Sequence, residues 1–310
     1  MEFYEIDKNK YTYVDILDQV ALLGKWVNDH IYIGSFSGDL LELSSQNDQF
    51  YKSRTLPAHC LAITDIGVSN DGQKIVSSSL DGTCVLTDAK DFKRIREINC
   101  PDAFSPHCAI KGDGSIVAVI GDHGSLYIDN GSETFSGRVS DAFFRSVKFF
   151  GEDESKIICL ARHTLAQIDV ETRQEEYHLY GSTPQNPGKL KLSINCFATH
   201  HSHKQIPVGT VGGYVQFFDF KEPKELVSQS KIGGKLIESM EFTQDGYTLA
   251  IASSDRTIRL MDMRTKTISD ELKPQRSRIL SVSFNNASTK LVSISEDQTA
   301  IIANVRPKDI

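Results

Sequence analysis

Seven copies of one short pattern follow each other along the chain, and this repeat constrains the fold more than any other feature. In the clearest copies, residues 73–88, 247–262 and 289–304, a β-forming run with small serines leads to an aspartate. A second alternating run then ends in Asp or Asn, seven residues after that aspartate. Four copies keep this spacing: Asp81 to Asp88, Asp122 to Asp129, Asp255 to Asp262 and Asp297 to Asn304.

Three more copies keep the frame without the aspartate, at residues 30–44, 156–169 and 205–219, and place Ser37, Arg162 and Gly212 at its position. The seven closing positions are therefore residues 44, 88, 129, 169, 219, 262 and 304. This period of about 43 residues predicts stacked supersecondary units, because one such unit cannot bury a hydrophobic face alone. The widest interval contains the Pro- and Gly-bearing insertion 181–192, which we expect to be an irregular loop.

Each unit is predicted to contain four strands. Apolar and polar residues alternate over 257–261 and 281–284, which is the period of a β-strand. Asp-Gly steps such as Asp71-Gly72 and Asp245-Gly246 are typical of tight turns. A more polar strand follows each closing position, for example residues 93–98. Three covered strands and one solvent-facing outer strand are what a propeller blade needs.

This pattern resembles the WD-repeat β-propeller family, and the resemblance covers essentially the whole chain. Two family features are weak here: the Gly-His dipeptide survives only as Ala58-His59, and other residues replace the closing Trp, namely Thr87, Ile128, Phe218, Met261 and Ala303. The family's polar network is therefore expected only in part, in the second blade, through His59, Thr64 and Asp81. Apolar packing between blades is expected to supply most of the stability.

The predicted fold is all-β: one seven-bladed propeller domain over residues 1–310. The first inner strand is expected around Ile16–Trp26, which leaves residues 2–7 as a spare strand. The chain ends just after the third strand of the seventh unit. We therefore predict that residues 2–7 close the ring as the outer strand of the last blade, since closure leaves only short, protected edges.

Composition narrows the function classes. The 34 Lys and Arg residues stand against 41 Asp and Glu residues, for a net charge of −7. This balance disfavours direct nucleic-acid binding, which needs a basic face. No apolar run reaches the roughly 18 residues of a membrane-spanning helix, and the six cysteines form no C-x-x-C pair. We expect a cytoplasmic protein with reduced thiols.

No catalytic motif or cofactor site is recognisable, so a non-enzymatic protein without cofactor or bound metal is predicted. The Gly233-Gly234-Lys235 step lacks the upstream glycine of a phosphate-binding loop. His200, His201 and His203 could chelate a metal, but we interpret them as an exposed polar loop between the first two strands of the fifth blade. A metal-binding propeller enzyme that uses these histidines remains the alternative from another class.

Loops that join an outer strand to the next inner strand share one face with the turns between second and third strands. Arginine and aromatic residues are typical of interface hot spots. We therefore predict a partner-binding face from Phe104, Phe144, Arg145, Arg162, Glu238, Arg256 and Arg278. The turn aspartates Asp81, Asp122, Asp255 and Asp297 are predicted to be structural, each accepting N–H groups of its own turn. The basic segment 266–278 is interpreted as a solvated edge, with a patch for an acidic peptide or RNA as the alternative.

Among WD-repeat proteins, the chain looks most similar to the WD-repeat subunit of the superkiller (Ski) complex, which in animals also associates with the RNA polymerase II-associated Paf complex. The residues that carry this likeness are 77–81 (SSSLD), 253–267 and 290–298. The resemblance implies a scaffold for exosome-mediated mRNA decay, with helical-repeat and helicase partners. It also implies a monomeric propeller within a hetero-complex, in the cytoplasm and also the nucleus. Another WD-repeat adaptor, in translation, trafficking or chromatin, is the alternative.

Overall fold

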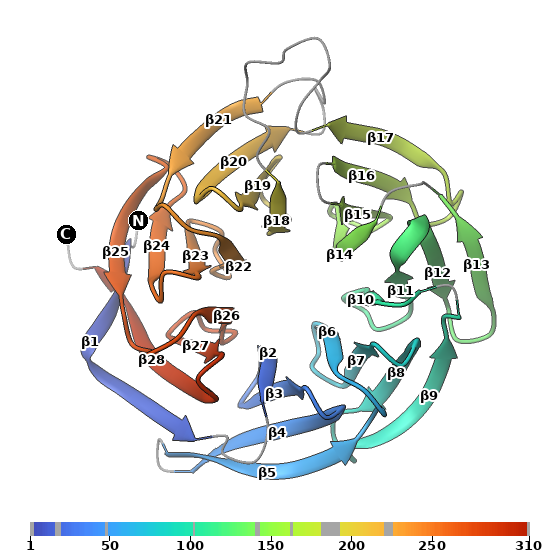
Figure 1. Cartoon of the computed structure of the whole chain (residues 1–310), viewed down its shortest axis with the longest axis horizontal. Coiled ribbons are helices and arrows are strands. Elements are labelled where there is room, and N and C mark those ends of the chain that lie inside the picture. Colours follow the sequence, from blue (N-terminus) through green and yellow to red (C-terminus); the bar gives the residue numbers. More distant parts are fainter. Residues whose placement is uncertain are drawn as a thin grey trace.

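The computed structural model describes residues 3–15, 20–46, 49–101, 103–139, 143–161, 164–180, 193–219 and 226–308. These residues form seven four-stranded antiparallel sheets arranged radially around a central axis (Figure 1). The prediction of an all-β, seven-bladed propeller is confirmed.

The blades follow each other in chain order, and the first strand of each lies innermost. Blade 1 consists of β2 (Ala21–Val27), β3 (His30–Ser35), β4 (Asp39–Gln46) and β5 (Gln49–Pro57). Blade 2 consists of β6 (Ile63–Val68), β7 (Lys74–Ser79), β8 (Thr83–Asp88) and β9 (Lys93–Asn99). Blade 3 consists of β10 (His107–Ile110), β11 (Val117–Ile120), β12 (Ser125–Asp129) and β13 (Thr134–Arg138). A 3₁₀ turn, η1 (Asp122–Gly124), joins β11 to β12.

Blades 4 to 7 repeat this order, except that the last blade takes its outer strand from the chain's beginning. Blade 4 consists of β14 (Phe144–Phe150), β15 (Lys156–Ala161), β16 (Thr164–Asp169) and β17 (Glu175–Tyr180), and blade 5 of β18 (Ile194–Phe197), β19 (Gln205–Thr210), β20 (Tyr214–Asp219) and β21 (Leu226–Lys231). Blade 6 consists of β22 (Ile237–Phe242), β23 (Thr248–Ser253), β24 (Ile258–Asp262) and β25 (Thr267–Leu272). Blade 7 consists of β26 (Ile279–Phe284), β27 (Lys290–Ser295), β28 (Thr299–Lys308) and β1 (Phe3–Asp15).

Strand β1 closes the ring by pairing with β28, as predicted for the N-terminal segment (Figure 1). The register runs from Phe3 opposite Lys308 to Asp15 opposite Thr299, with an irregularity between Ile6 and Tyr11. The closing strand is thus longer than the predicted 2–7. The first inner strand starts only at Ala21, which corrects the predicted start at Ile16; residues 16–19 lie outside the described residues.

Apolar side chains between neighbouring sheets form the core, because the second and third strands are covered on both faces. Every residue of β23 is buried, whereas most of β9 is exposed. One cluster joins Ile258 and Leu260 of blade 6 to Ile279 and Val282 of blade 7. Burying such side chains contributes roughly 1.5–3 kcal/mol each, so the contacts between blades hold the ring together.

A polar network supports blade 2, but its members differ from those predicted. The His59 ring donates through Nδ1 to Thr83 Oγ1 (2.9 Å) and accepts at Nε2 from Ser77 Oγ (2.9 Å). The Thr83 hydroxyl donates in turn to Asp81 Oδ1 (2.6 Å), which fixes this tautomer. Thr64 lies outside the network, because its hydroxyl donates to the Pro106 carbonyl. Ser77 therefore takes the place predicted for Thr64.

Thr87 occupies the closing position at which the family carries Trp, and its hydroxyl is buried without a hydrogen-bond partner. The network thus runs from Asp81 through Thr83 and His59 to Ser77 and does not extend to Thr87. Within the described part of the chain, no helix is long and apolar enough to cross a membrane.

Candidate functional site

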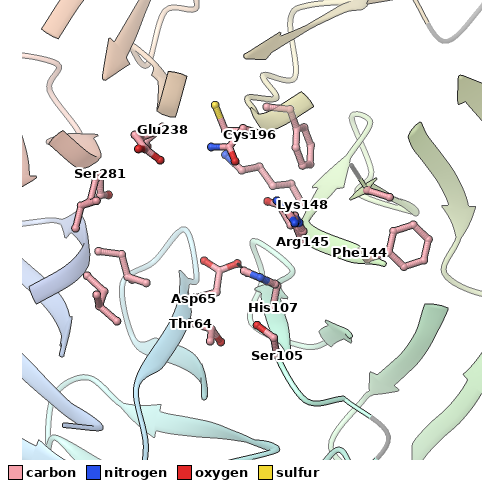
Figure 2. Close-up of a pocket in the computed structure, with 18 of the residues that line it drawn as sticks. Thr64, Asp65, Ser105, His107, Phe144, Arg145, Lys148, Cys196, Glu238 and Ser281 are labelled. Carbon is pink, nitrogen blue, oxygen red and sulfur yellow. Dashed lines mark ion pairs between the residues drawn. The ribbon is translucent and has the colours of Figure 1, made fainter. Parts of the chain in front are cut away.

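The inner strands of all seven blades line a central channel. We call the face that carries the turns between second and third strands, together with the loops to each next inner strand, the loop face. A cavity of about 950 Å³ opens there at the channel mouth. Figure 2 shows side chains from several blades lining it, including Asp65, His107, Lys148 and Glu238.

The channel mouth holds charges of both signs. His107 Nδ1 lies 3.6 Å from Asp65 Oδ2, and Glu238 Oε1 lies 3.9 Å from Arg278 Nη1. Burial raises the pKa of Glu238 above its usual value, against the opposing pull of Arg278. Its buried Oε1 accepts no hydrogen bond. An ionised carboxylate is therefore only partly compensated at this position.

Two further groups at the mouth are desolvated. Burial lowers the pKa of the Lys148 ammonium, and Lys25 adds to this effect; its Nζ lies 5.6 Å from the ring centre of Phe197. Burial raises the pKa of Cys196 to about 12, so its thiol stays protonated at neutral pH. A protonated thiol is a poor nucleophile, so Cys196 offers no activated group for covalent catalysis.

The two phenylalanines of the predicted partner-binding face have different positions. Phe104 lies on the loop face and is 72% exposed. Phe144 is 1% exposed and belongs to the core between blades 3 and 4, which corrects the prediction. It opens β14, where side chains alternate between the core and the channel. The exposed aromatic is its neighbour Phe143 (53% exposed), whose ring lies 4.7 Å from that of His123.

The charged residues predicted for this face lie around the mouth. Arg145 and Glu238 line the cavity. Arg256 is exposed in the turn between β23 and β24, and Arg278 is exposed in front of β26, with its Nε 3.2 Å from Glu296 Oε2. Arg162 and the insertion 181–192 lie outside the described residues.

Three of the four turn aspartates hold their own turns. Each accepts a backbone N–H from two residues further on: Thr83 to Asp81 (3.0 Å), Thr257 to Asp255 (3.1 Å) and Thr299 to Asp297 (3.2 Å). Asp122 differs, because it begins the 3₁₀ turn η1 and lines the cavity, while its backbone carbonyl accepts from Ser125 Oγ. The structure therefore gives Asp122 a different local setting from the other three.

Exposed large hydrophobic residues gather on the loop face. Of thirteen such residues in the described chain, seven lie there, one lies on the opposite face and five lie on outer strands. Six of the seven belong to consecutive blades 1 to 4 and form what we call the apolar arc: Val20, Phe36, Leu61, Leu80, Phe104 and Phe143. A gathering of this kind marks an interaction surface.

Sequence reasoning found only Phe104 of the apolar arc. Phe36 and Leu80 each come directly after a second strand, where the repeat elsewhere has Ser254 or Glu296. An apolar residue at this turn position was the available signal, because turns are usually polar. This signal was hard to recognise because the β-forming runs next to these turns are also apolar.

The other half of the loop face is charged. We call the exposed cations on the loops of blades 6 and 7 the basic sector: Lys235, Arg256, Lys273, Arg276 and Arg278. Three of them come from the basic segment 266–278. Lys266, from the same segment, instead directly precedes β25, at the end of that strand away from the loop face, and its Nζ donates to Gln205 and Ser228.

Comparison with known proteins supports the fold at the level of one repeat. Residues 50–88 match the family described as "WD domain, G-beta repeat", and no curated protein matches the chain. The matched segment runs from β5 through β8 and contains the His59 network. The chain is a seven-bladed β-propeller with a WD40 repeat.

The matched WD40 repeat is offset from the blade by one strand. It combines the outer strand of blade 1, β5, with the first three strands of blade 2. Each repeat so placed ties two neighbouring blades together covalently. The same offset explains why the chain's first strand, β1, completes blade 7.

The candidate metal-binding histidines, His200, His201 and His203, lie on the face opposite the loop face, in the connection between β18 and β19. His200 and His203 donate through Nε2 to the carbonyls of Gln244 (3.1 Å) and Gly246 (2.6 Å) in blade 6. Burial lowers the pKa of His200. These two rings tie blade 5 to blade 6, and the described residues contain no group of three or more His, Cys, Asp or Glu placed to hold a metal.

Proposed function

We propose that this propeller is a non-catalytic scaffold that binds protein partners on its loop face. The apolar arc is the observation that carries the proposal, since six exposed large side chains on four consecutive blades have no role in the core. Aromatic residues are enriched at the centre of protein interfaces, and a few buried anchors there carry most of the binding energy.

The experiment is co-purification from native cells with quantitative mass spectrometry. The bait is the wild type, the arc variant Phe36→Ser/Leu80→Ser, or a rim variant Tyr51→Ser/Ile95→Ser, which removes similarly exposed apolar residues from the outer strands. We expect the arc variant to lose the partners that the rim variant keeps. Partners lost only from the rim variant would overturn the proposal.

The finer proposal is a superkiller-type complex for exosome-mediated mRNA decay, with a Paf-complex role in animals. It rests on the sequence likeness at residues 77–81, 253–267 and 290–298. Several of these residues are structural here: Ser77 to Ser79 are buried, and Asp81 holds its turn. The likeness is thus carried partly by residues that stabilise the blade itself.

The same co-purification tests this finer proposal. A helical-repeat scaffold and a helicase are the expected partners, with this chain as a single propeller in the hetero-complex, in the cytoplasm and the nucleus. Recovery of subunits from translation, trafficking or chromatin assemblies would reject the superkiller assignment and keep the scaffold.

A further inference from the structure

Most carboxylates on the loop face have a partner within the described protein, whereas most of the cations there do not. Near the mouth and the basic sector, Asp65 pairs with His107, and Arg278 lies within 4 Å of both Glu238 and Glu296. Asp255 Oδ2 accepts from Arg259 Nη2 at 2.8 Å. Asp297 instead accepts backbone N–H groups, among them that of Arg276 at 2.7 Å. Most of these carboxylates thus already have a hydrogen-bonding or charged partner inside the protein.

The cations on the same face are not compensated in this way. No described carboxylate lies within ion-pair distance of six of them: Arg145, Lys148, Lys235, Arg256, Lys273 and Arg276. Five of these side chains are exposed, and Lys148 is half-buried. Asp122 is the counterpart of opposite sign, a half-buried carboxylate at the mouth that forms no ion pair with any described residue. The loop face therefore presents an excess of available positive charge in a protein whose net charge is −7.

These cations lie on neighbouring connections. Ser254 in the turn that carries Arg256 donates its N–H to the Leu236 carbonyl (2.9 Å), next to Lys235. Arg276 is fixed by its backbone to Asp297 of blade 7. Because the backbone is held at Arg256 and Arg276 and no described carboxylate pairs with their side chains, these cations form a pre-organised part of the surface, and little backbone entropy remains to be lost there on binding.

We propose that the partner segment bound on the loop face is an acidic peptide with large apolar side chains. Its apolar side chains lie on the apolar arc, and its Asp or Glu residues lie on the basic sector. This inference rests on the proposed scaffold function and adds the chemistry of the partner. Charge complementarity of this kind fixes the orientation of a bound segment and accelerates its association.

The surface favours a peptide over RNA. Three members of the apolar arc, Val20, Leu61 and Leu80, are aliphatic and offer no stacking platform for bases. Asp65, Asp122 and Glu238 line the cavity between the two halves of the face. Phosphates that cross the mouth would meet these carboxylates, whereas a peptide can place neutral residues there.

The test is selection of a displayed library of random 16-residue peptides on the full-length protein, followed by affinity measurements on the enriched peptides. The arc variant is Phe36→Ser/Leu80→Ser, and the basic-sector variant is Lys273→Glu/Arg276→Glu. Two rim variants match them in type and exposure: Tyr51→Ser/Ile95→Ser and Lys90→Glu/Lys93→Glu. All eight side chains are exposed, and unchanged melting curves verify that each variant folds.

We expect enriched peptides to combine Asp or Glu with Phe, Leu, Ile or Trp. Their affinity should fall at least tenfold in both the arc and basic-sector variants, stay within twofold in both rim variants, and weaken with added salt. Alkylation of Cys60, the only exposed cysteine, should slow when such a peptide is bound, because Cys60 adjoins Leu61.

Other outcomes separate the two proposals. Enriched peptides with neutral or basic flanks, sensitive to the arc variant only, would overturn the acidic-peptide inference and leave the scaffold function standing. Peptides insensitive to both loop-face variants would overturn both proposals. Tight binding of a 20-nucleotide oligouridine, lost in the basic-sector variant and kept in the arc variant, would assign this surface to RNA instead.

Discussion

The two halves of the loop face share one backbone pattern and differ in their side chains. In each, the first residue after the second strand donates its N–H to the carbonyl just before an inner strand: Phe36 to Val20 (2.8 Å), Leu80 to Ala62 (3.0 Å) and Glu296 to Arg278 (3.1 Å). Because the backbone alone makes this bond, the fold does not specify the side chain there. Apolar residues in blades 1 and 2 and charged residues in blade 7 thus point to a role outside the fold.

The halves also differ in what holds their loops in place. In blade 2 the neutral ring of His59, whose side chain is fully buried, links Ser77 to Thr83. In blade 6 the guanidinium of Arg259 binds Asp255 and reaches Glu271 at 3.5 Å. Removing a buried, hydrogen-bonded neutral side chain lowers the free energy of unfolding more than removing one member of a partly solvated ion pair. Substitutions in blade 2 should therefore destabilise the protein more than those in blade 6.

The largest loss of stability is expected from a change at the junction of blades 7 and 1, where the two halves meet. Deletion of residues 1–10 removes the pairing of Phe3–Ile6 with Val305–Lys308. It exposes the edge of β28, so the free energy of unfolding should fall by more than about 4 kcal/mol. Thermal and urea denaturation measure it against the full chain. An unchanged transition would show that residues 1–10 do not contribute to ring closure.

The second largest effect is expected for His59→Ala. The substitution leaves a cavity and unpaired hydroxyls on Ser77 and Thr83, which should cost about 3 kcal/mol. Cys60 alkylation should accelerate as the loop loosens. His30→Ala is the control, because the His30 side chain is 40% exposed and lies beside Ser44 (3.1 Å) and Glu42 (3.5 Å), so its removal leaves no enclosed cavity. Equal losses in both variants would contradict a special role for the His59 network.

A smaller loss is expected for Arg259→Ala in the charged half. Arg259 is mostly buried, but Asp255 and Glu271 keep access to solvent, so the cost should be about 1–2 kcal/mol. The pKa of Asp255, which desolvation would raise, is held below its usual value by the hydrogen bonds and charge of Arg259. NMR titration of Asp255 should therefore show a higher pKa in the variant. A loss larger than that of His59→Ala would reverse the comparison.

Glu238→Gln should raise the free energy of unfolding at neutral pH, whereas the three changes above should lower it. Burial raises the pKa of Glu238, so the folded state disfavours its ionised form, and that cost is present at pH values above the raised pKa. The amide removes the cost, so the variant should be more stable at pH 7.5 by about 0.5 kcal/mol. Below pH 4.5 the carboxyl is protonated in both states, and the gain should vanish. Urea denaturation at pH 7.5 and pH 4 measures this; a gain that grows on acidification would contradict it.

The smallest change in stability is expected for the apolar arc itself. Phe36→Ser/Leu80→Ser alters exposed side chains, so the free energy of unfolding should stay within about 0.5 kcal/mol of the wild type. Fluorescence of an anilinonaphthalene sulfonate dye, which binds exposed apolar patches, should nevertheless fall. The rim variant Tyr51→Ser/Ile95→Ser should reduce it less. A large loss of stability would mean that the arc belongs to the core.

Much of the fold could be predicted from the sequence, because a repeat multiplies weak local signals. One β-forming run is ambiguous, but seven at a common spacing fix the number of blades and the place of the outer strands. The sequence could not place Phe144, because a residue at a strand start can face the core or the channel. Nor could it separate Ser77 from Thr64 as the partner of His59, since both lie within reach along the blade.

The sequence by itself determined the ring, its closure by the N-terminal strand and the turns held by aspartate, because these depend on local spacing and short-range hydrogen bonds. Only the tertiary structure decided which surface side chains lie together. The apolar arc gathers residues from position 20 to position 143, and the basic sector gathers residues from 235 to 278. The repeat predicts that these loops share one face, but only the curvature of the ring sets which of their side chains lie next to one another around the mouth.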